Sequence, residues 1–309
     1  MINKNVIKTK VQSVLDIMET NNLEQAVSDK ATGILSSVNE YAFRVLMLGG
    51  FSSGKSAFLN TLLKRQVLTE NQTPETAIAT ELVYDTEEYI VAVDEKNQTK
   101  RFDFSEAADL LPSDWRYLVY HINSEFLRDN PDIVLVDMPG IDSNIEWHDK
   151  AIAQYVVKGS AYVLLVSSED GTLRRDTSSF LKEVAQYPQS LICYISKADL
   201  KTEETVKDVV EQVKKEIVAV YGEAVPTSSI SVFDDDFTDK AKNGISSFSP
   251  QELFEKKFSA EVNELVSLGK AAIKTAKEAV MLDVDDINKK IRECTDARDV
   301  SVRRFENDK

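Results

Sequence analysis

The stretch "FRVLMLGGFSSGKSAFLNTLL", residues 43–63, determines the local fold of this chain. Its apolar start predicts a buried strand over 43–48, and its end predicts a helix over 55–64. The loop between them is rich in glycine and serine and ends in a lysine. Loop N–H groups, a helix N-terminus and an ammonium group together bind an anion such as phosphate. The spacing of Gly49, Gly54, Lys55 and Ser56 is that of a P-loop.

The middle of the chain alternates predicted strands and helices. We expect further strands at 79–84, 88–94, 131–137, 161–167 and 190–196, with residues 88–104 forming a hairpin, and helices at 148–158, 175–186 and 203–220. This alternation predicts an α/β fold, in which a mostly parallel central sheet is covered by helices on both faces. Ligands of such sheets bind at the carboxyl ends of the strands.

The two ends of the chain read as helices. Residues 1–40 carry an apolar stripe with a break near 20–22, and a second long helix is predicted from Pro250 to about residue 305. The acidic, turn-rich residues 234–249 are predicted to be a linker or surface loop. We expect the two stripes to bury each other in a helical bundle, called the neck below. Their members are Val6, Val11, Val14, Leu15 and Met18 in the first, and Phe258, Val262, Leu265, Ile273 and Val280 in the second.

The chain is therefore divided into N-terminal neck helices (1–40), a nucleotide-binding domain (41–242) and a C-terminal neck or stalk helix (243–309). A net charge of −15 argues against nucleic acid as a partner. Two cysteines indicate a reducing compartment, and no apolar run is long enough to span a bilayer. We expect a cytoplasmic protein, and association with a membrane surface stays open.

Two further motifs follow predicted strands. In "VDMPG", Asp137 is expected to hold Mg²⁺, while the N–H of Gly140 meets a γ-phosphate. In "SKAD", the Asp199 carboxylate can accept two hydrogen bonds from guanine, and the stem of Lys197 can lie along the purine face. The expected ligands are therefore GTP or GDP with Mg²⁺, rather than ATP.

A threonine-rich loop, "TENQTPETAIATELVYD", lies between the first two motifs. A GTPase needs a mobile threonine whose hydroxyl binds Mg²⁺ and whose backbone senses the γ-phosphate. Thr73, Thr76 and Thr80 are the candidates, and the pattern alone leaves the choice among them open.

These motifs together resemble the GTPase domain of the dynamin superfamily, especially its bacterial members, over about residues 42–232. The carrying stretches are "GGFSSGKSAFLNTLL", "TPETAIATEL", "VDMPGID" and "SKAD". The resemblance implies that Lys55 contacts the β- and γ-phosphates, that Ser56 and Thr76 bind Mg²⁺, and that Ser52 is the catalytic P-loop serine. It also implies that the nucleotide contacts the other residues of the P-loop, which are Gly49, Phe51, Ser53, Gly54 and Ala57. A later loop is implied to touch the base through Ser228 or Ser229.

Two positions depart from better-known switches. Phe51 stands where eukaryotic dynamins have a glutamine, and Ile141 stands where Ras-like proteins place a water-orienting glutamine. The family compensates by dimerising GTPase domains across the nucleotide, which orders the switches and, in some members, a monovalent cation (Na⁺ or K⁺). The resemblance thus implies a homodimer through this domain. Partners of the C-terminal helix are expected in stalk helices or in a C-terminal region outside these 309 residues.

The function predicted from these observations is Mg²⁺-dependent GTP hydrolysis, activated by dimerisation and coupled through the neck to mechanical work on a membrane or partner. Two alternatives stay open. One is an ordinary switch GTPase, Era-like or septin-like, which recruits partners without self-assembly. The other is a nucleotide-dependent scaffold that hydrolyses nothing.

Overall fold

The computed structural model describes residues 2–69, 78–111, 113–141, 155, 158–186 and 190–307. Contacts divide the chain into two compact units, which are described separately. The first comprises Met1–Ile2 and Ala42–Lys256, and the second comprises Asn3–Tyr41 and Lys257–Lys309. The first unit extends to Lys256, past residue 242, where the sequence predicts the end of the nucleotide-binding domain.

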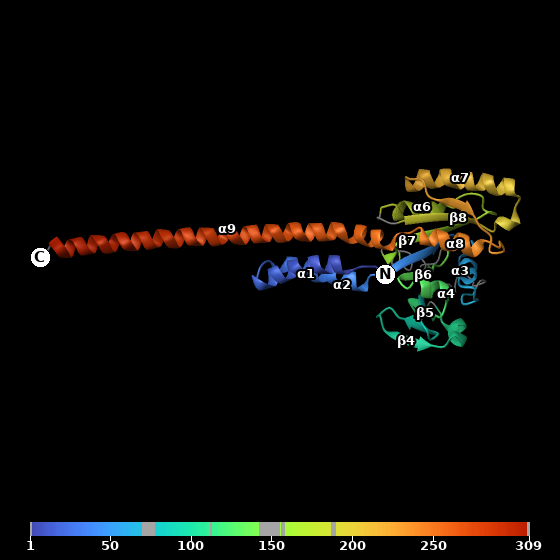
Figure 1. The fold of residues 1–309 in the computed structure, drawn as a ribbon, viewed down its shortest axis with the longest axis horizontal. Helices are drawn as coiled ribbons and strands as arrows, with labels where there is room; N and C mark the ends of the chain where they lie inside the picture. Colours follow the sequence, from blue (N-terminus) through green and yellow to red (C-terminus); the bar gives the residue numbers. More distant parts are fainter. Residues whose placement is uncertain are drawn as a thin grey trace. The chain divides into compact units, whose positions relative to one another are not determined.

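A mixed sheet forms the centre of the first unit (Figure 1). The order of its described strands is β4-β3-β5-β2-β6-β1-β7-β8-β9. Pairing is parallel between β1 and both of its neighbours, between β2 and β5, and from β7 to β9, and it is antiparallel elsewhere. The bounds are β1 Phe43–Leu48, β2 Thr80–Tyr84, β3 Tyr89–Val93, β4 Thr99–Phe102, β5 Tyr117–Ile122, β6 Ile133–Asp137, β7 Ala161–Ser167, β8 Ser190–Ser196 and β9 Thr227–Ser229. The predicted α/β fold with a mostly parallel sheet is confirmed.

Helices cover both faces of this sheet, as the alternating side chains of β1 require. Phe43, Val45 and Met47 join one apolar cluster with the helices α3 and α8, while Leu46 and Leu48 join another with α6 and α7. The helices α6 and α7 also contact each other (Figure 1). The helix bounds are α3 Lys55–Leu63, α4 Glu125–Asp129, α6 Arg175–Val184, α7 Glu203–Tyr221 and α8 Phe237–Ser246, with 3₁₀ turns at Phe104–Asp109 (η2) and Ala198–Leu200 (η3).

Several elements of the first unit were not predicted, among them α4, β5, α8 and β9. The expected linker at 234–249 contains α8, because Phe237, Ala241 and Ile245 recur every fourth residue and are buried in the core. The segment was predicted as a linker because it is rich in Asp, Gly and Ser, which are common in loops. Strand β5 was not predicted, although Leu118, Tyr120 and Ile122 alternate as buried residues. The helix predicted at 148–158 lies almost wholly outside the described residues.

The second unit contains the N-terminal helices α1 (Asn5–Thr20) and α2 (Gln25–Glu40) and most of α9 (Pro250–Asn307). Close packing of α1 on α9 is evident at Gly269, where a Cβ atom would lie 3.3 Å from Val14 Cγ1. Lys30 of α2 forms an ion pair with Glu264 of α9 at 2.5 Å. The buried residues are Ile7, Val11, Leu15 and Met18 on α1, and Phe258, Val262, Leu265 and Ala272 on α9.

Three members of the predicted stripes lie outside this packing. Val6 is 56% exposed, and Ile273 and Val280 are 41% and 61% exposed, so burial along α9 ends near Ala272. In the described part of the chain, no helix is both long enough and apolar enough to cross a membrane.

We predict that Leu265→Asp destabilises the second unit, because Leu265 is fully buried between helices and its replacement places an unpaired carboxylate there. The expected loss is about 2–5 kcal/mol of unfolding free energy. Ile287→Asp on the same helix is the matched control, since Ile287 is 55% exposed. Thermal unfolding and protease susceptibility measure the effect. Equal resistance of Leu265→Asp and wild type would contradict the packing described here.

Candidate functional site

The loop between β1 and α3 has backbone angles that its glycines make possible. Gly49 has φ +149°, and a Cβ atom on it would lie 2.4 Å from the carbonyl oxygen of Leu165. Gly54 has φ +90° at the N-cap of α3. Ser52, which is not a glycine, also lies in the left-handed region at φ +61°. The loop is therefore held in a strained, fixed shape around the start of α3.

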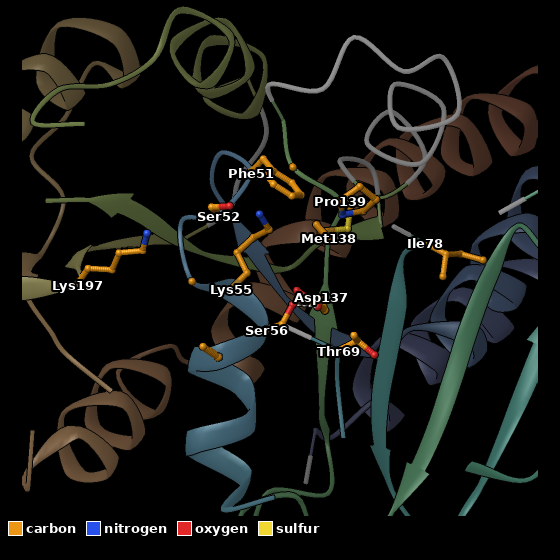
Figure 2. A pocket seen from close by; sticks show the side chains of 13 residues that line it. Phe51, Ser52, Lys55, Ser56, Thr69, Ile78, Asp137, Met138, Pro139 and Lys197 are labelled. Carbon is orange, nitrogen blue, oxygen red and sulfur yellow. Dashed lines mark hydrogen bonds between the residues drawn. The ribbon is translucent and has the colours of Figure 1, made fainter. Parts of the chain in front are cut away.

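Lys55 points back into this loop. Its Nζ donates hydrogen bonds to the carbonyl oxygens of Gly49 (3.1 Å) and Gly50 (2.9 Å), and the residue is 8% exposed. Figure 2 shows its ammonium group in the cavity, near the labelled Phe51 and Ser52. The geometry thus supplies a desolvated cation at the N-terminus of a helix, which is an anion-binding arrangement.

Ser56 and Asp137 meet beside the lysine. The Ser56 hydroxyl donates to Asp137 Oδ2 at 2.7 Å (Figure 2). Asp137 ends β6, and Ser56 lies in the first turn of α3, which follows β1, the parallel neighbour of β6. The other carboxylate oxygen, Oδ1, is buried and accepts no hydrogen bond among the described residues, and neither does the Ser53 hydroxyl oxygen. Buried polar atoms normally have partners, so the oxygen of Asp137, which lines the cavity described below, indicates a place for a ligand, whereas Ser53 lines neither cavity.

The raised pKa of Asp137 is consistent with a site that binds a cation. Burial raises the pKa of Asp137 above its ordinary value, and Lys55 and the Ser56 hydrogen bond only partly counteract this. A hard divalent cation such as Mg²⁺ takes oxygen ligands, and a serine hydroxyl beside an unsatisfied carboxylate oxygen provides them. The residues present therefore fit Mg²⁺, with Ser56 and Asp137 as its holders.

A cavity of about 300 Å³, called the P-loop cavity, contains these groups. Four of its lining residues were not predicted as site residues: Thr69, Ile78, Met138 and Pro139. Thr69 offered a signal as the first threonine of the loop assigned to the switch. The predicted site residues that line the cavity are Phe51, Ser52, Gly54, Lys55, Ser56, Ala57, Asp137, Gly140 and Lys197.

A second cavity of about 290 Å³, called the Asp199 cavity, shares Gly54, Ala57 and Lys197 with the first. Two hydrogen bonds of the Ser196 and Ser168 hydroxyls fix this junction: Ser196 donates to Ser53 O (2.7 Å) and Ser168 to Lys197 O (2.7 Å). The Lys197 ammonium forms an ion pair with Glu169 at 2.8 Å, which lowers the pKa of that carboxyl. The lysine stem is thereby extended where the two cavities join.

The carboxylate of Asp199 is oriented by Ser231, whose hydroxyl donates to Asp199 Oδ1 at 2.6 Å. Ser228 and Ser229, the predicted base contacts, lie in β9, which ends two residues before Ser231. Sequence reasoning missed Ser231, although it is the first polar residue after the apolar Ile230. Phe233 lines the same cavity with its ring 81% exposed.

The predicted switch threonines have different outcomes. Thr73 and Thr76 lie outside the described residues. Thr80 is the first residue of β2, is 5% exposed and donates its hydroxyl to Ile78 O at 3.1 Å. Thr80 is thus held within the sheet, opposite Asp137 in register.

The fold and these two joined cavities define a P-loop nucleotide-binding protein. Residues 45–199 match the model of the dynamin family. This is half of the chain, and the chain belongs to the dynamin family. The match confirms the predicted resemblance to a dynamin-superfamily GTPase domain.

Two curated relatives match at 25% identity. An uncharacterized protein in the xynA 3′ region of Caldicellulosiruptor sp. (strain Rt8B.4) aligns over 214 residues, covering 67% of this chain and 52% of the relative. A probable transmembrane GTPase, FZO-like and chloroplastic, of Arabidopsis thaliana aligns over 178 residues, covering 56% and 17%. The chain thus spans about half the length of the first relative and less of the second.

Solved structures from a study of an oligomerised bacterial dynamin pair share the fold. One has a TM-score of 0.57 at 17% identity, and the match covers 95% of this chain and 52% of the solved chain. Another has a TM-score of 0.57 at 16% identity, covering 85% and 42%. These matches extend beyond the sheet to most of the described chain, while each solved chain is about twice as long as this one.

We predict that Asp137→Asn leaves the nucleotide-free protein at least as stable as wild type at pH 7. Because the folded-state pKa of Asp137 is raised, the ionised carboxylate opposes folding above that pKa, and its contribution improves as pH falls. The same change removes the carboxylate that fits Mg²⁺, so the gain in GTP affinity on adding Mg²⁺ should shrink by about tenfold or more, ~1.4 kcal/mol. Thermal unfolding from pH 5 to 8 and binding titrations with and without Mg²⁺ measure both effects. A destabilised variant that keeps its full Mg²⁺ response would contradict the assignment.

Proposed function

We propose that this dynamin-family chain binds GTP with Mg²⁺ and hydrolyses it to GDP and phosphate. The observation that carries the proposal is the Ser56–Asp137 hydrogen bond with its unsatisfied Oδ1, next to the inward-pointing Lys55. Dynamin-family P-loop domains are GTP-hydrolysing enzymes as a class, and the charges present here match that chemistry.

The proposed roles follow from position. Lys55 and the N–H groups from Gly49 to Ala57 surround the phosphates and offset negative charge on the transferring phosphoryl group. Bound Mg²⁺ supplies further compensation of phosphate charge. Ser52, held at φ +61°, and Gly140 both line the P-loop cavity, and we propose that they face the γ-phosphate. Thr76 is proposed as the threonine that senses the γ-phosphate.

The base is proposed to occupy the Asp199 cavity. Asp199, oriented by Ser231, accepts from the guanine N1–H and N2–H₂ groups, which adenine does not present in this pattern. The stem of Lys197 lies on one side of the base, and the exposed ring of Phe233 offers an apolar surface to it.

Dimerisation is proposed as the means of activation. Among the described residues that line the P-loop cavity, none is a glutamine, glutamate or histidine that could orient the attacking water. We propose that another copy of the GTPase domain, placed across the nucleotide, contributes to ordering this water. The oligomerised bacterial dynamin pair that this fold resembles supports the idea.

The helical unit is proposed to transmit the result as mechanical work on a membrane or partner. Several apolar side chains of α9 beyond the bundle are 48–61% exposed, including Val280, Val284, Ile287 and Ile291. We propose that stalk helices of a longer dynamin-like chain cover them, because the matching bacterial chain has about twice this length. Sensing and tethering of membranes are attributed to that bacterial pair, and a peripheral membrane role is proposed here by analogy.

The first prediction of this proposal concerns turnover. GTP hydrolysed per molecule per minute should rise with protein concentration, because active domains form in pairs. Phosphate release measured over a hundredfold concentration range, beside light scattering with GDP and aluminium fluoride, tests this. Lys55→Ala is the control and should lose nucleotide binding. Constant turnover per molecule would favour an ordinary switch GTPase, and binding without turnover would favour a scaffold.

The second prediction concerns base choice. Asp199→Asn replaces an acceptor oxygen with a donor that faces guanine N–H groups, so GTP affinity should fall by about ten- to a hundredfold, roughly 1.5–3 kcal/mol. Asp235→Asn is a matched control, because Asp235 is exposed on the loop after β9 and lines neither nucleotide cavity among the described residues. Competition titrations with labelled GDP measure both variants. Equal losses in the two variants would mean that Asp199 has no special role.

A further inference from the structure

Two side chains from separate segments donate hydrogen bonds to one buried carboxylate, that of Glu81. Arg44 Nε donates to Glu81 Oε1 at 2.9 Å, and the hydroxyl of Tyr155 donates to the same oxygen at 2.9 Å. Arg44 lies in β1 and Glu81 in β2, and these strands are not neighbours, because β6 lies between them. Val134 and Val136 of β6 pair with Arg44 and Glu81, so the guanidinium reaches across an entire strand.

The network is almost closed to water. The side chains of Arg44 and Glu81 are 19% and 7% exposed, and Tyr155 is fully buried. The nearby Glu81 carboxylate more than offsets the effect of burial on Arg44, whose pKa is raised. Burial, with Glu81 beside it, raises the pKa of Tyr155 far above its ordinary value, so its hydroxyl remains a donor.

Such a network is costly as a source of stability. Desolvating an ion pair generally cancels much of its attraction, and apolar replacements of similar volume are often neutral or stabilising. Several buried side chains on this face, including Leu46, Val134 and Val136, belong to one apolar cluster. An apolar pair here would fit that cluster, which points to a role for the polar network other than stability.

The network joins the segments that carry the nucleotide motifs. β1 leads into the P-loop, and β6, which Arg44 spans, ends at Asp137. Glu81 is the second residue of β2, soon after the loop that contains Thr76. Tyr155 follows Gly140 by 15 positions. A single oxygen atom therefore receives hydrogen bonds from the strand before the P-loop and from the chain that follows Gly140.

We propose that Arg44, Glu81 and Tyr155 are positioning residues, which set the ends of the two γ-phosphate-sensing segments relative to the P-loop. This inference rests on the proposed GTP hydrolysis. None of the three residues lines either nucleotide cavity, so the network acts through the strands and not by contact with nucleotide. The network is therefore expected to affect recognition of the γ-phosphate, and not binding of the β-phosphate or the base.

Tyr155→Phe is the first test, because it removes one hydroxyl and keeps the ring, which packs edge-on against Tyr117. Displacement of reacting groups by about an ångström can cost up to a hundredfold in rate. We expect kcat to fall by about tenfold while KM and GDP affinity change by less than about twofold. The ratio of affinities for a non-hydrolysable GTP analogue and GDP should fall by about threefold.

The second test separates positioning from stability. The triple variant Arg44→Met, Glu81→Leu and Tyr155→Phe, which replaces all three polar side chains of the network, should unfold at or above the wild-type temperature, yet should show the same loss of kcat and of analogue preference. The matched control is the exposed pair Arg101 and Glu87, 59% and 74% exposed, changed to Gln and Gln. The control should keep wild-type turnover.

The inference is overturned if both network variants keep kcat and analogue preference within twofold of wild type, or if turnover falls only in proportion to lost folded protein. A wild type that binds the GTP analogue but does not hydrolyse GTP contradicts the proposed function alone. In that case the ratio of the affinities for the GTP analogue and for GDP still tests the positioning role of the network. If both network variants keep the wild-type ratio, the positioning role is overturned.

Discussion

The structure depends on holding a lysine ammonium and an aspartate carboxylate out of water at the same place. Lys55 is turned inward onto the Gly49 and Gly50 carbonyls, and Asp137 keeps one buried oxygen without a partner among the described residues. Neither charge is stable there unless the loop shape, the strand ends and a bound ligand compensate it. The sheet meets the first two needs. β1 and β6 pair in parallel, so their carboxyl ends deliver the P-loop and Asp137 side by side.

The same constraint explains the order of the rest of the unit. β8 ends at Ser196, whose hydroxyl binds the P-loop backbone, and this fixes the Asp199 cavity against the P-loop cavity. Arg44 and Glu81 connect β1 and β2 across β6, so the strand before the P-loop and the chain after Gly140 both reach one buried carboxylate. The second unit has its own packing of α1 and α2 against α9. The match to the dynamin family lies within the first unit, and the second unit adds a helical bundle to it.

Motif-bearing features could be predicted because local chemistry fixes them. Gly49, Gly54 and Lys55 are required by backbone angles and charge at a phosphate cradle, and their strand–loop–helix context is visible in the sequence. The contacts of Ser231 and Glu81 could not be predicted, because each depends on which strands become neighbours. α8 was missed since its apolar period lies in a segment with a loop-like composition. The apolar stripe of α9 predicted helix well, but not that burial ends near Ala272, because the length of the partner helices decides this.

The central claim is that these joined cavities bind a guanine nucleotide through its phosphates, magnesium and base together. The most direct measurement is equilibrium binding of GTP and ATP to the purified chain, each with and without Mg²⁺. The account predicts that GTP binds at least a hundredfold more tightly than ATP, ~2.7 kcal/mol, and that Mg²⁺ strengthens GTP binding. Equal affinities for GTP and ATP, or GTP binding indifferent to Mg²⁺, would contradict it.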